Sequence, residues 1–505
     1  MTPRFPGRRR ARLSLLAALV LMPALADAVC QPGQRLALLH FNDFHGQLEP
    51  YADTEGAPPI GGIARLAATV ARVRAEDPGR PTVLLFAGDL LQGTLTSSLF
   101  LGVPDAALFG RMGVDAAVMG NHELDYGQAV FRRLAQQAEF PILAANIHSD
   151  PEPLPVKAAA VLERPGGLRI AVLGLVTTEL TTATHPRNID GISVEQPATV
   201  AARLVPGLRA RADLVVVLSH LGIADDRRLA RSVPGIDLIV GGHNHNLYAQ
   251  PIREGETDIV QAGERGGWLG RLDLECRDGR LAPADYALIP IDATSPEDPE
   301  IAAEVARSAA QADRELGQTV GQSAVELSAR RELIRRGESP FGDFLADRAR
   351  EISQADIALF NAGGFRASIP AGPVTLKSVY RAFPFRNELV LGGLTGAQLL
   401  AALERSAAYD PNDNPGGFLQ VSGVRYVVAG RRLVSATVAG APIAPERVYR
   451  VATSDFLAAG GDGYDMLQSM QDRVATGRPI ADMVIDAFRT ASPVDPRPDG
   501  RIVRQ

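Results

Sequence analysis

The sequence predicts an α/β protein of stacked layers, divided into two domains and preceded by a short segment of a different kind. Its 505 residues exceed the roughly 100 to 200 residues of a typical domain. Short apolar runs alternate with helical periodicity from residue 36 to about residue 291. A break rich in Pro and Asp follows, and a second mixed segment with several Gly-rich loops begins after it.

Residues 1–28 are predicted to be a cleaved signal peptide. Five arginines between Arg4 and Arg12 precede an apolar run over residues 13–25, and Ala26-Asp27-Ala28 offers the small residues of a cleavage site. The run is shorter than the roughly 20 residues that span a bilayer, and a retained N-terminal anchor is the alternative. We therefore expect a periplasmic or secreted protein without a stable membrane anchor, exported by the Sec or the twin-arginine route.

The composition excludes several classes of protein and of partner. With 46% hydrophobic residues and two cysteines, the chain is neither disordered nor collagen-like nor disulfide-dense. The formal charge is −6, and loss of the five arginines and Asp27 of the predicted signal peptide makes it −10. This charge argues against a nucleic-acid partner. Cys30 and Cys276 either pair in an oxidising compartment or remain free and buried.

Residues 29–291 are predicted to form the first domain, because strand-like and helical stretches alternate along them. The stretch 60–75 has helical periodicity, with Ile63, Leu66 and Val70 on one face. Such alternation is typical of β and α layers that pack on one another.

Five apolar runs of this domain stop at residues that can bind a metal ion. The runs are residues 36–41, 83–87, 116–119, 214–218 and 236–240. The candidate ligands that follow them are Asp43, His45, Asp89, Asn121, His220, His243 and His245. Ligands of such folds lie beyond the carboxyl ends of the strands, where neighbouring loops meet. The repetition carries this prediction, since a single His or Asp after a strand is usually structural; His40, His148 and His185 are predicted to be structural or surface residues.

The candidate ligands offer oxygen and imidazole nitrogen but no thiolate. This donor set favours Mn²⁺, Zn²⁺, Fe, Co²⁺ or Mg²⁺ over a closed structural zinc site. Seven ligands are too many for one ion, and a carboxylate with two oxygens can bridge two ions about 3.5 to 4 Å apart. The sequence therefore predicts a pair of divalent ions that activates water and clamps phosphoryl oxygens.

Together these motifs resemble the metallophosphatase half of the secreted 5′-nucleotidase/UDP-sugar hydrolase family. The resemblance rests on Asn42-Asp43-x-His45-Gly, Gly88-Asp89-x-x-Gln92-Gly-Thr, Gly120-Asn121-His122-Glu-x-Asp125-Tyr-Gly, Ser219-His220-x-Gly and Gly241-Gly-His-x-His245. It implies a calcineurin-like domain, a layered β-sandwich flanked by helices. It also implies that one ion is bound by Asp43, His45 and His245, that the other is bound by Asn121, His220 and His243, and that Asp89 bridges them.

The family has a catalytic His–Asp dyad after the Asn ligand, and the dyad falls here on His122 and Asp125. A cationic His122 beside the developing phosphorane would stabilise its negative charge. Asp125 would orient the ring and favour its protonated form.

Residues 318–505 resemble the nucleotide-binding C-terminal domain of the same family, which implies a mixed α/β substrate-binding domain. The matching motifs are Asn361-Ala-Gly-Gly-Phe-Arg366, Pro384-Phe385 and Phe456-Leu-Ala-Ala-Gly-Gly-Asp462. The resemblance implies that Asn361, Arg366, Phe385, Phe456 and Asp462 bind the nucleotide. Two aromatic faces can sandwich a base, and a carboxylate can accept hydrogen bonds from ribose hydroxyls.

One departure from the family pattern concerns phosphate binding. Relatives commonly have Gly-Asn before a short helix, whereas this chain has Gly342-Asp343. We predict that Arg335 joins Arg366 in binding phosphate through charge-assisted hydrogen bonds. The added charge leaves the neighbouring Arg336 as the alternative.

Residues 292–317 are predicted to be a linker followed by a helix. Turn residues and acidic residues after Asp292 precede an Ala-rich stretch over residues 301–316. The resemblance implies that the substrate bridges a cleft between the two domains, and that the domains rotate about this linker.

The sequence therefore predicts an exported 5′-nucleotidase with two divalent ions. It would hydrolyse nucleoside 5′-monophosphates, its small-molecule substrates, by in-line attack of a metal-held hydroxide. One alternative is a UDP-sugar or dinucleotide pyrophosphatase, or a 2′,3′-cyclic-nucleotide 2′-phosphodiesterase/3′-nucleotidase, since the same metal centre serves all of these. A non-catalytic nucleotide-binding protein is the remote alternative. No oligomeric state is predicted.

Overall fold

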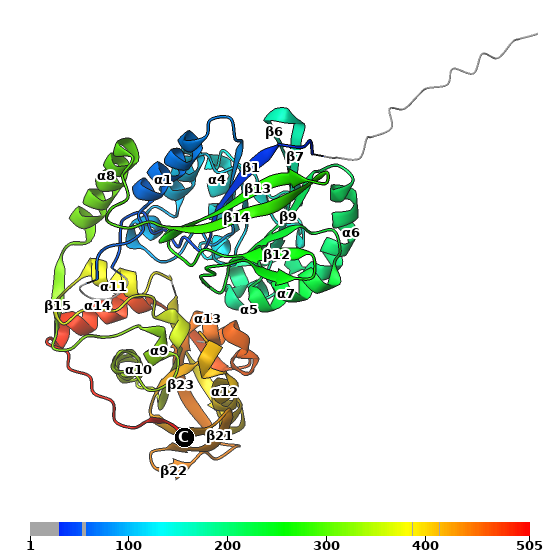
Figure 1. Ribbon diagram of the computed structural model, residues 1–505. Helices are drawn as coiled ribbons and strands as arrows, with labels where there is room; N and C mark the ends of the chain where they lie inside the picture. Colours follow the sequence, from blue (N-terminus) through cyan, green and yellow to red (C-terminus); the bar gives the residue numbers. More distant parts are fainter. Residues whose placement is uncertain (1–29, 53–56, 386, 414) are drawn as a thin grey trace, which may run out of the picture.

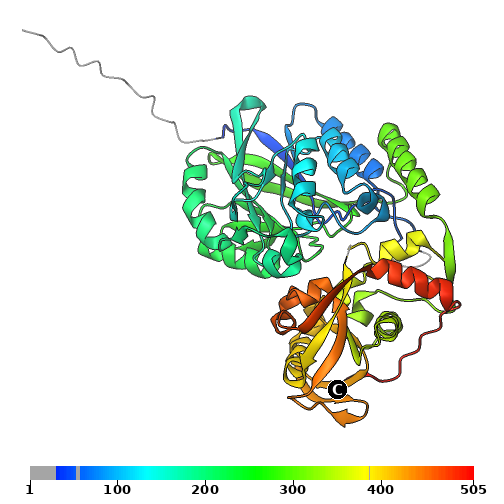
Figure 2. The same ribbon diagram turned by 180° about the vertical axis from the view of Figure 1, so that it is seen from behind.

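The computed structural model describes residues 30–52, 57–385, 387–413 and 415–505. They form an N-terminal lobe and a C-terminal lobe, which are seen from opposite sides in Figure 1 and Figure 2. The predicted signal peptide, residues 1–28, lies outside the described residues. Among the helices of the described part of the chain, none combines the length and the apolar character needed to cross a membrane.

Two six-stranded sheets form the centre of the N-terminal lobe. The first has the order β14 (Arg280–Pro290), β13 (Trp268–Arg277), β1 (Arg35–Phe41), β2 (Thr82–Phe86), β3 (Ala116–Val118), β4 (Ile142–Leu143). The second has the order β11 (Ile252–Glu254), β12 (Thr257–Val260), β10 (Leu238–Val240), β9 (Leu214–His220), β7 (Leu168–Val176), β6 (Ala159–Arg164). Side chains of both sheets, such as Leu38 and Val216, share one buried cluster, so the sheets pack as a sandwich.

The parallel strands bring distant loops to one place. Strands β1 to β4 pair in parallel in the first sheet, and β7, β9, β10 and β12 pair in parallel in the second. Every residue of β9 is buried, as expected of a strand covered on both faces. The carboxyl ends of these strands therefore meet along one edge of the sandwich.

Helices cover the outer faces of both sheets (Figure 1). The second sheet is covered by α6 (Pro197–Arg209) and α7 (Ile223–Ser232), which share an apolar cluster with β7 and β9. On the first sheet lie α1 (Ile63–Glu76), which confirms the helix predicted at 60–75, together with α3 (Val103–Met112) and α4 (Gln128–Gln137). Smaller elements of this lobe are α2 (Leu95–Leu99), η1 (His122–Leu124), β5 (Ile147–Ser149), η2 (Pro165–Gly167), α5 (Leu180–Ala183), η3 (Pro186–Asn188), β8 (Ile192–Val194). The predicted layered sandwich flanked by helices is confirmed.

The C-terminal lobe is a mixed α/β unit with its own buried core, as predicted. Its main sheet has the order β19 (Leu419–Ser422), β16 (Ile357–Asn361), β23 (Val448–Ser454), β18 (Glu388–Thr395), β24 (Gln471–Pro479). A second sheet has the order β22 (Ala441–Pro442), β21 (Arg432–Val438), β20 (Val424–Ala429), β25 (Ile502–Arg504), and β15 (Thr319–Ser323) pairs with β17 (Gly372–Thr375). The helices are α9 (Arg331–Ile334), α10 (Pro340–Ser353), α11 (Leu376–Ala382), α12 (Gly396–Ala408), α13 (Asp455–Ala458), α14 (Ile480–Thr490). Short 3-10 turns are η4 (Ala362–Gly364), η5 (Pro411–Asp413), η6 (Gly461–Gly463), η7 (Asp465–Leu467).

A single long helix, α8 (Pro299–Leu316), leads from one lobe to the other and confirms the helix predicted at 301–316. The Asp298 side chain caps its first turn by accepting the backbone N–H groups of Glu300 and Ile301. Ile301 belongs to the core of the N-terminal lobe. At the other end, Asp313 forms a 2.5 Å ion pair with Lys377 of the C-terminal lobe.

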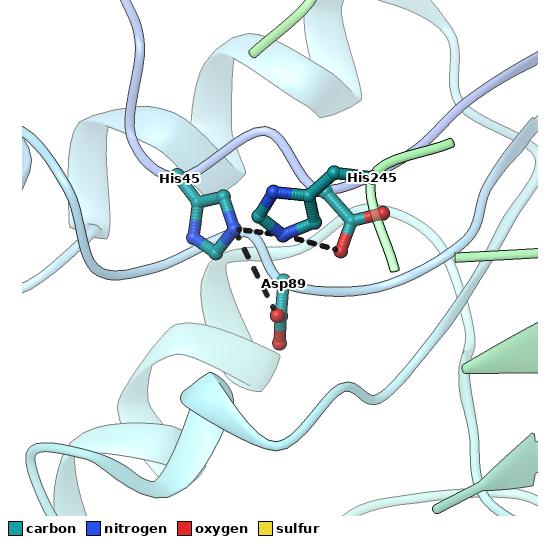
Figure 3. Close-up of side chains that lie close together, drawn as sticks. His45, Asp89 and His245 are labelled. Carbon is teal, nitrogen blue, oxygen red and sulfur yellow. Dashed lines mark hydrogen bonds and ion pairs between the residues drawn. The ribbon is translucent and has the colours of Figure 1, made fainter. Parts of the chain in front are cut away.

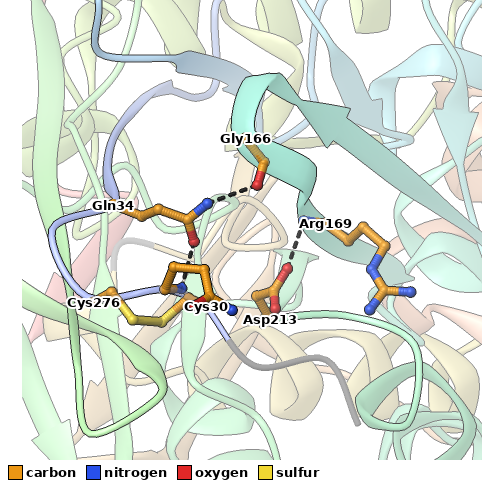
Figure 4. Close-up of a disulfide and its surroundings, with 7 residues drawn as sticks. Cys30, Gln34, Gly166, Arg169, Asp213 and Cys276 are labelled. Carbon is orange, nitrogen blue, oxygen red and sulfur yellow. Dashed lines mark hydrogen bonds between the residues drawn. A yellow bond between two sulfur atoms is a disulfide. The ribbon is translucent and has the colours of Figure 1, made fainter. Parts of the chain in front are cut away.

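Cys30 and Cys276 form a disulfide, which excludes the alternative of two free thiols (Figure 4). The bond ties the first described residue to the end of β13, and closes a loop with a sequence separation of 246 residues. Beside it, the Gln34 side chain donates a 2.7 Å hydrogen bond to the Gly166 carbonyl. Disulfides persist in oxidising compartments, so the bond is consistent with export.

Candidate metal centre and substrate cleft

All seven candidate metal ligands lie at the carboxyl edge of the sandwich. Asp43 and His45 follow β1, Asp89 follows β2 and Asn121 follows β3. His220 ends β9, and His243 and His245 follow β10. The fold therefore brings together residues that are as far apart in the sequence as Asp43 and His245.

Most of these residues have an unusual backbone conformation. The φ angles of Asp43, His45, Asp89, His243 and His245 are 49°, 53°, 60°, 77° and 60°. This left-handed region costs a residue with a side chain about 1 to 3 kcal/mol, and residues held in it cluster at functional sites. Here the loops aim the side chains inward at the cost of local backbone strain.

One group of four side chains is compact. His45, Asp89 and His245 point toward one another (Figure 3). The Nε2 atoms of His45 and His245 are 3.1 Å apart, and His245 Nε2 lies 3.4 Å from Asp43 Oδ1. Each of the four residues offers a ligand atom, and these atoms lie within 4.8 Å of one another. This is the group expected at the first ion, together with the expected bridge.

The other three candidate ligands lie next to this group. His243 Nδ1 is 3.1 Å from Asn121 Oδ1, and the rings of His243 and His220 are 5.2 Å apart between centroids. Asp89 Oδ2 is 3.2 Å from His220 Nε2 and 3.9 Å from His45 Nε2. Asp89 therefore lies between the two groups, as a bridging carboxylate would.

The donor atoms of the cluster fit a bound cation. Burial, with the charge of a neighbouring His245, lowers the pKa of His45 well below its usual value, so its ring is neutral. The Nε2 atoms of His45 and His245 face each other at 3.1 Å, and an Nε2 without a proton offers its lone pair to a metal ion. His220 Nε2 is buried, and its 3.2 Å contact with Asp89 Oδ2 lacks the geometry of a hydrogen bond. Oxygen and imidazole donors in this arrangement suit a divalent metal ion.

The predicted dyad is formed at the same edge. His122 Nδ1 lies 2.5 Å from Asp125 Oδ2, and His122 Nε2 lies 4.0 Å from Asp89 Oδ2. Burial alone lowers the pKa of His122, but the carboxylates of Asp125 and Asp89 outweigh it, and the pKa is raised. The neighbouring Glu123, which was not predicted, accepts the backbone N–H of Leu90 at 2.6 Å and that of Gly120 at 2.7 Å. Its carboxylate thereby joins the loops after β2 and β3.

Two of the predicted nucleotide residues, Asn361 and Phe456, contact Asp462 or its neighbour Gly461 in the C-terminal lobe. Asn361 donates a 2.8 Å hydrogen bond to Asp462 Oδ2, and the Tyr409 hydroxyl donates a 2.7 Å bond to its carbonyl. Burial raises the pKa of Asp462 to about 6, although Asn361 opposes this shift. Phe456 packs against Gly461, where a Cβ would lie 2.4 Å from its ring. Gly461 is therefore required for this approach.

Three arginines of the C-terminal lobe line the same cavity as His243 and His245. Burial and the charges of neighbouring arginines lower the pKa of Arg335 to about 9 and that of Arg366 to about 10. Arg366 also lies over the ring of Phe385, with Cζ at 5.7 Å from the ring centroid. The ring centroids of Phe385 and His122 are 6.5 Å apart. The third arginine, Arg331, was not predicted. An anion bound among these cations would relieve their mutual repulsion.

A cleft of 1390 Å³ between the lobes joins the two sets of residues. The predicted site residues that line it are Asp89, Asn121, His122, Asp125, His243, His245, Arg335, Asn361, Arg366, Phe385, Phe456, Asp462. Arg335 lines the cleft, whereas the alternative Arg336 is not among the lining residues. Asp43, His45 and His220 are buried behind it.

Comparison with known proteins agrees with this division. Residues 36–247 match the calcineurin-like phosphoesterase family, and residues 319–469 match the C-terminal domain of 5′-nucleotidases. The crystal structure of a 5′-nucleotidase precursor from Thermus thermophilus is 33% identical, with a TM-score of 0.85, over 93% of this chain and 99% of that one. The chain belongs to the 5′-nucleotidase family.

Other relatives are also similar over most of the chain. Protein UshA of Escherichia coli strain K12 is 29% identical over 97% of both sequences. The trifunctional nucleotide phosphoesterase YfkN of Bacillus subtilis strain 168 is 29% identical over 92% of this chain, which spans only 35% of that longer protein. The family resemblance seen in the motifs is confirmed, and this 5′-nucleotidase family member is a phosphoester hydrolase of the metallophosphoesterase class.

Proposed function

We propose that the chain is an exported enzyme that hydrolyses nucleoside 5′-monophosphates to nucleosides and phosphate. The observation that carries the proposal is that one cleft is lined on one side by the metal cluster and the dyad, and on the other by the two phenylalanines and Asp462. A mononucleotide has a phosphate for the first side and a nucleoside for the second.

The metal centre is proposed to hold two divalent ions. Asp43, His45 and His245 would hold one, and Asn121, His220 and His243 the other, with Asp89 between them. The contacts among these residues support this division. Bound ions would activate water and neutralise the phosphoryl oxygens. The donor set fits Mn²⁺, Zn²⁺, Fe, Co²⁺ or Mg²⁺ and does not select one of them.

His122 and Asp125 are proposed to act together on the phosphate. The 2.5 Å contact at Nδ1 orients the ring and directs Nε2 to the cleft. A ring that carries its proton at Nε2 donates a hydrogen bond to an oxygen on which negative charge develops. The carboxylates of Asp125 and Asp89 raise the pKa of His122 against the effect of burial, which favours the protonated ring.

The C-terminal lobe is proposed to select the substrate. Arg335 and Arg366 would bind phosphate oxygens, which prefer the planar fork of a guanidinium. Phe385 and Phe456 would stack on the base, and Asp462, held by Asn361, would accept hydrogen bonds from the ribose hydroxyls. Every base offers a flat face, so stacking alone does not choose among bases.

The domain boundaries and the export route are also proposals. We place the signal peptide at residues 1–28, the metallophosphatase domain at 29–291, the linker and helix at 292–317, and the nucleotide-binding domain at 318–505. The separate cores of the two lobes support the division, and the disulfide supports export to an oxidising compartment.

Purified protein loaded with Mn²⁺ or Zn²⁺ is expected to release phosphate from AMP and to lose this activity with a chelator. Ribose 5-phosphate serves as the control substrate, because it has the phosphate without a base to stack. Phosphate release from AMP at the same rate as from ribose 5-phosphate would contradict the proposed role of the C-terminal lobe.

The size of the cleft favours a second candidate activity. Its 1390 Å³ and its further lining residues, such as Arg133 and Arg187, leave room for a substrate longer than a mononucleotide. UDP-sugars and dinucleotides are therefore substrates to compare with AMP. The 2′,3′-cyclic nucleotides are no longer than AMP and are compared because the same metal centre would serve them. A higher kcat/KM for UDP-glucose or for 2′,3′-cyclic AMP than for AMP would replace the first candidate with the second.

A further inference from the structure

The histidines of the metal centre differ in what holds the ring nitrogen that faces away from the cluster. In His45 this nitrogen, Nδ1, lies 3.2 Å from the carbonyl oxygen of Leu91. In His220 it lies 2.8 Å from the carbonyl oxygen of Ala87. Both rings are thus held by the backbone of the loop and strand end next to Asp89.

The other two histidines are held by carboxylates that no motif predicted. His243 Nε2 lies 3.0 Å from Glu179 Oε2, and His245 Nδ1 lies 2.8 Å from Glu264 Oε2. A carboxylate behind a ligating imidazole fixes which nitrogen carries the proton and makes the other nitrogen a stronger ligand. The two glutamates therefore form a natural pair for comparison.

The backbone around Glu264 is tied to the metal loops. Glu264 lies between β12 and β13, where the Arg265 N–H donates a 2.7 Å hydrogen bond to the Asp43 carbonyl. On its other side, the Gly263 N–H donates a 2.8 Å bond to the Asn246 carbonyl. The carboxylate thus has a fixed base from which to reach His245.

Glu264 also contacts the other lobe. Arg331, on α9, places Nη2 3.7 Å from Glu264 Oε2, and both of its Nη atoms lie 3.2 Å from His245 Nδ1. A guanidinium only donates hydrogen bonds, and an Nδ1 that carries a proton also donates. When His245 uses Nε2 as its ligand atom, its Nδ1 carries the proton and cannot accept a hydrogen bond from Arg331. His245 Nδ1 and Arg331 then both have the Glu264 carboxylate as their acceptor. Burial raises the pKa of Glu264, but His245, Arg265 and Arg331 bring it well below its usual value.

We propose that Glu264 is a positioning residue that orients His245 and takes Arg331 as its partner from the C-terminal lobe, so that contact between the lobes strengthens metal binding. The inference rests on the proposed metal centre. Linkage requires the converse as well, namely that metal binding strengthens the contact between the lobes by the same factor. Glu179 and His243 both belong to the N-terminal lobe, so Glu179 provides the matched comparison.

The test is a titration of the metal-free full-length protein with Mn²⁺ in the presence of a competing chelator. It compares the wild-type protein with Glu264→Gln, Glu179→Gln and Arg331→Met. Two double variants combine Arg331→Met with Glu264→Gln or with Glu179→Gln. Glu264→Gln is expected to weaken binding of one of the two ions by about 10- to 100-fold. The effects of Glu264→Gln and Arg331→Met are expected to be non-additive by about threefold or more, and those of Glu179→Gln and Arg331→Met to be additive. Unfolding of each variant in the presence of EDTA shows whether its metal-free form is folded. If Glu264→Gln is less stable than the wild-type protein in this measurement, Glu264→Asp, which has a shorter side chain, replaces it with the same expectation.

Unchanged Mn²⁺ affinity in the Glu264 variant would overturn the positioning role. Additive effects of the Glu264 and Arg331 substitutions would overturn the coupling between the lobes. AMP hydrolysis by the wild-type protein reports on the proposed function separately. A wild-type protein that binds two Mn²⁺ ions and hydrolyses AMP keeps that function whatever the Glu264 variant does, whereas one that binds no Mn²⁺ loses both.

Discussion

The proposed metal centre and the proposed nucleotide clamp, formed by Phe385, Phe456 and Asp462, line one cleft, but they are built in different ways. The metal residues leave the ends of parallel strands on strained loops, and most are fully buried. The clamp residues come from separate elements of the C-terminal lobe, and Phe385 keeps part of its ring exposed at the cleft. In the proposed function, the chemistry therefore depends on side chains fixed at strand ends, whereas recognition depends on aromatic faces on which any base can stack. Substitutions in the metal centre are therefore expected to lower turnover, and substitutions in the clamp are expected to weaken nucleoside binding.

Loss of the bridging carboxylate is expected to have the largest effect. Asp89→Ala removes the group between the two sets of metal ligands, and several kcal/mol of charge stabilisation with it, so kcat/KM for AMP is expected to fall by about three orders of magnitude. Adenosine binding, measured by calorimetry, is expected to stay within about threefold of wild type because the clamp is untouched. Equal turnover in Asp89→Ala would refute the metal assignment.

Loss of one stacking face is expected to give the opposite pattern. Phe385→Leu removes an aromatic surface worth about 1 to 3 kcal/mol per base, so KM for AMP is expected to rise by about 10- to 100-fold while kcat changes little. Steady-state kinetics with ribose 5-phosphate supply the control, since this substrate has no base. A fall in kcat with unchanged KM would show that Phe385 serves the metal half instead.

Acid is expected to weaken the clamp through Asp462. Its raised pKa of about 6 means that the carboxylate is ionised at pH 7 and protonated at pH 5. The ionised form accepts hydrogen bonds from ribose hydroxyls, so the dissociation constant of adenosine is expected to rise by up to about tenfold between pH 7 and pH 5. Adenosine has no phosphate to titrate in this range. Asp462→Asn should remove the pH dependence, and a variant that keeps it would assign the titration to another group.

The smallest effect concerns the stability of the N-terminal lobe. His40 is buried, and burial lowers its pKa to about 3. The folded state keeps the ring neutral, whereas the unfolded state binds a proton below about pH 6.5, so stability is lost as the pH falls from 6.5 toward 3. At pH 5 the loss amounts to about 2 kcal/mol. Urea unfolding of His40→Leu is expected to show a smaller loss between pH 7 and pH 5 than wild type, and an equal loss would exclude His40 as the cause.

The sequence predicted the metal half more completely than the clamp half, for a physical reason. A ligand at the end of a parallel strand has its position set by the strand, so the strand pattern alone was enough to place Asp89 and His220. Phe456 looks like any core phenylalanine, and only the family motif marks it. The choice of Arg335 over Arg336 depends on the turn after α9, which places Arg335 in the cleft.

The residues that sequence reasoning missed act through tertiary contacts. Glu179 and Glu264 lie in loops without a motif, and each becomes significant only because a histidine from another segment comes within 3.0 Å. Arg331 lies on a helix of four residues, and its contact with Glu264 exists because the two lobes meet. A carboxylate near the Gly-His-x-His motif in space, rather than in sequence, is the signal that would have found Glu264.

The proposed chemistry depends on two cations that share the Asp89 carboxylate at the edge of the sandwich. Elemental analysis of the active protein, combined with anomalous scattering from its crystals, decides whether they are there. Two metal ions per chain are expected, roughly 3.5 to 4 Å apart, with Asp89 contacting both. A single ion in fully active protein, or two ions of which neither contacts Asp89, would rule out this arrangement.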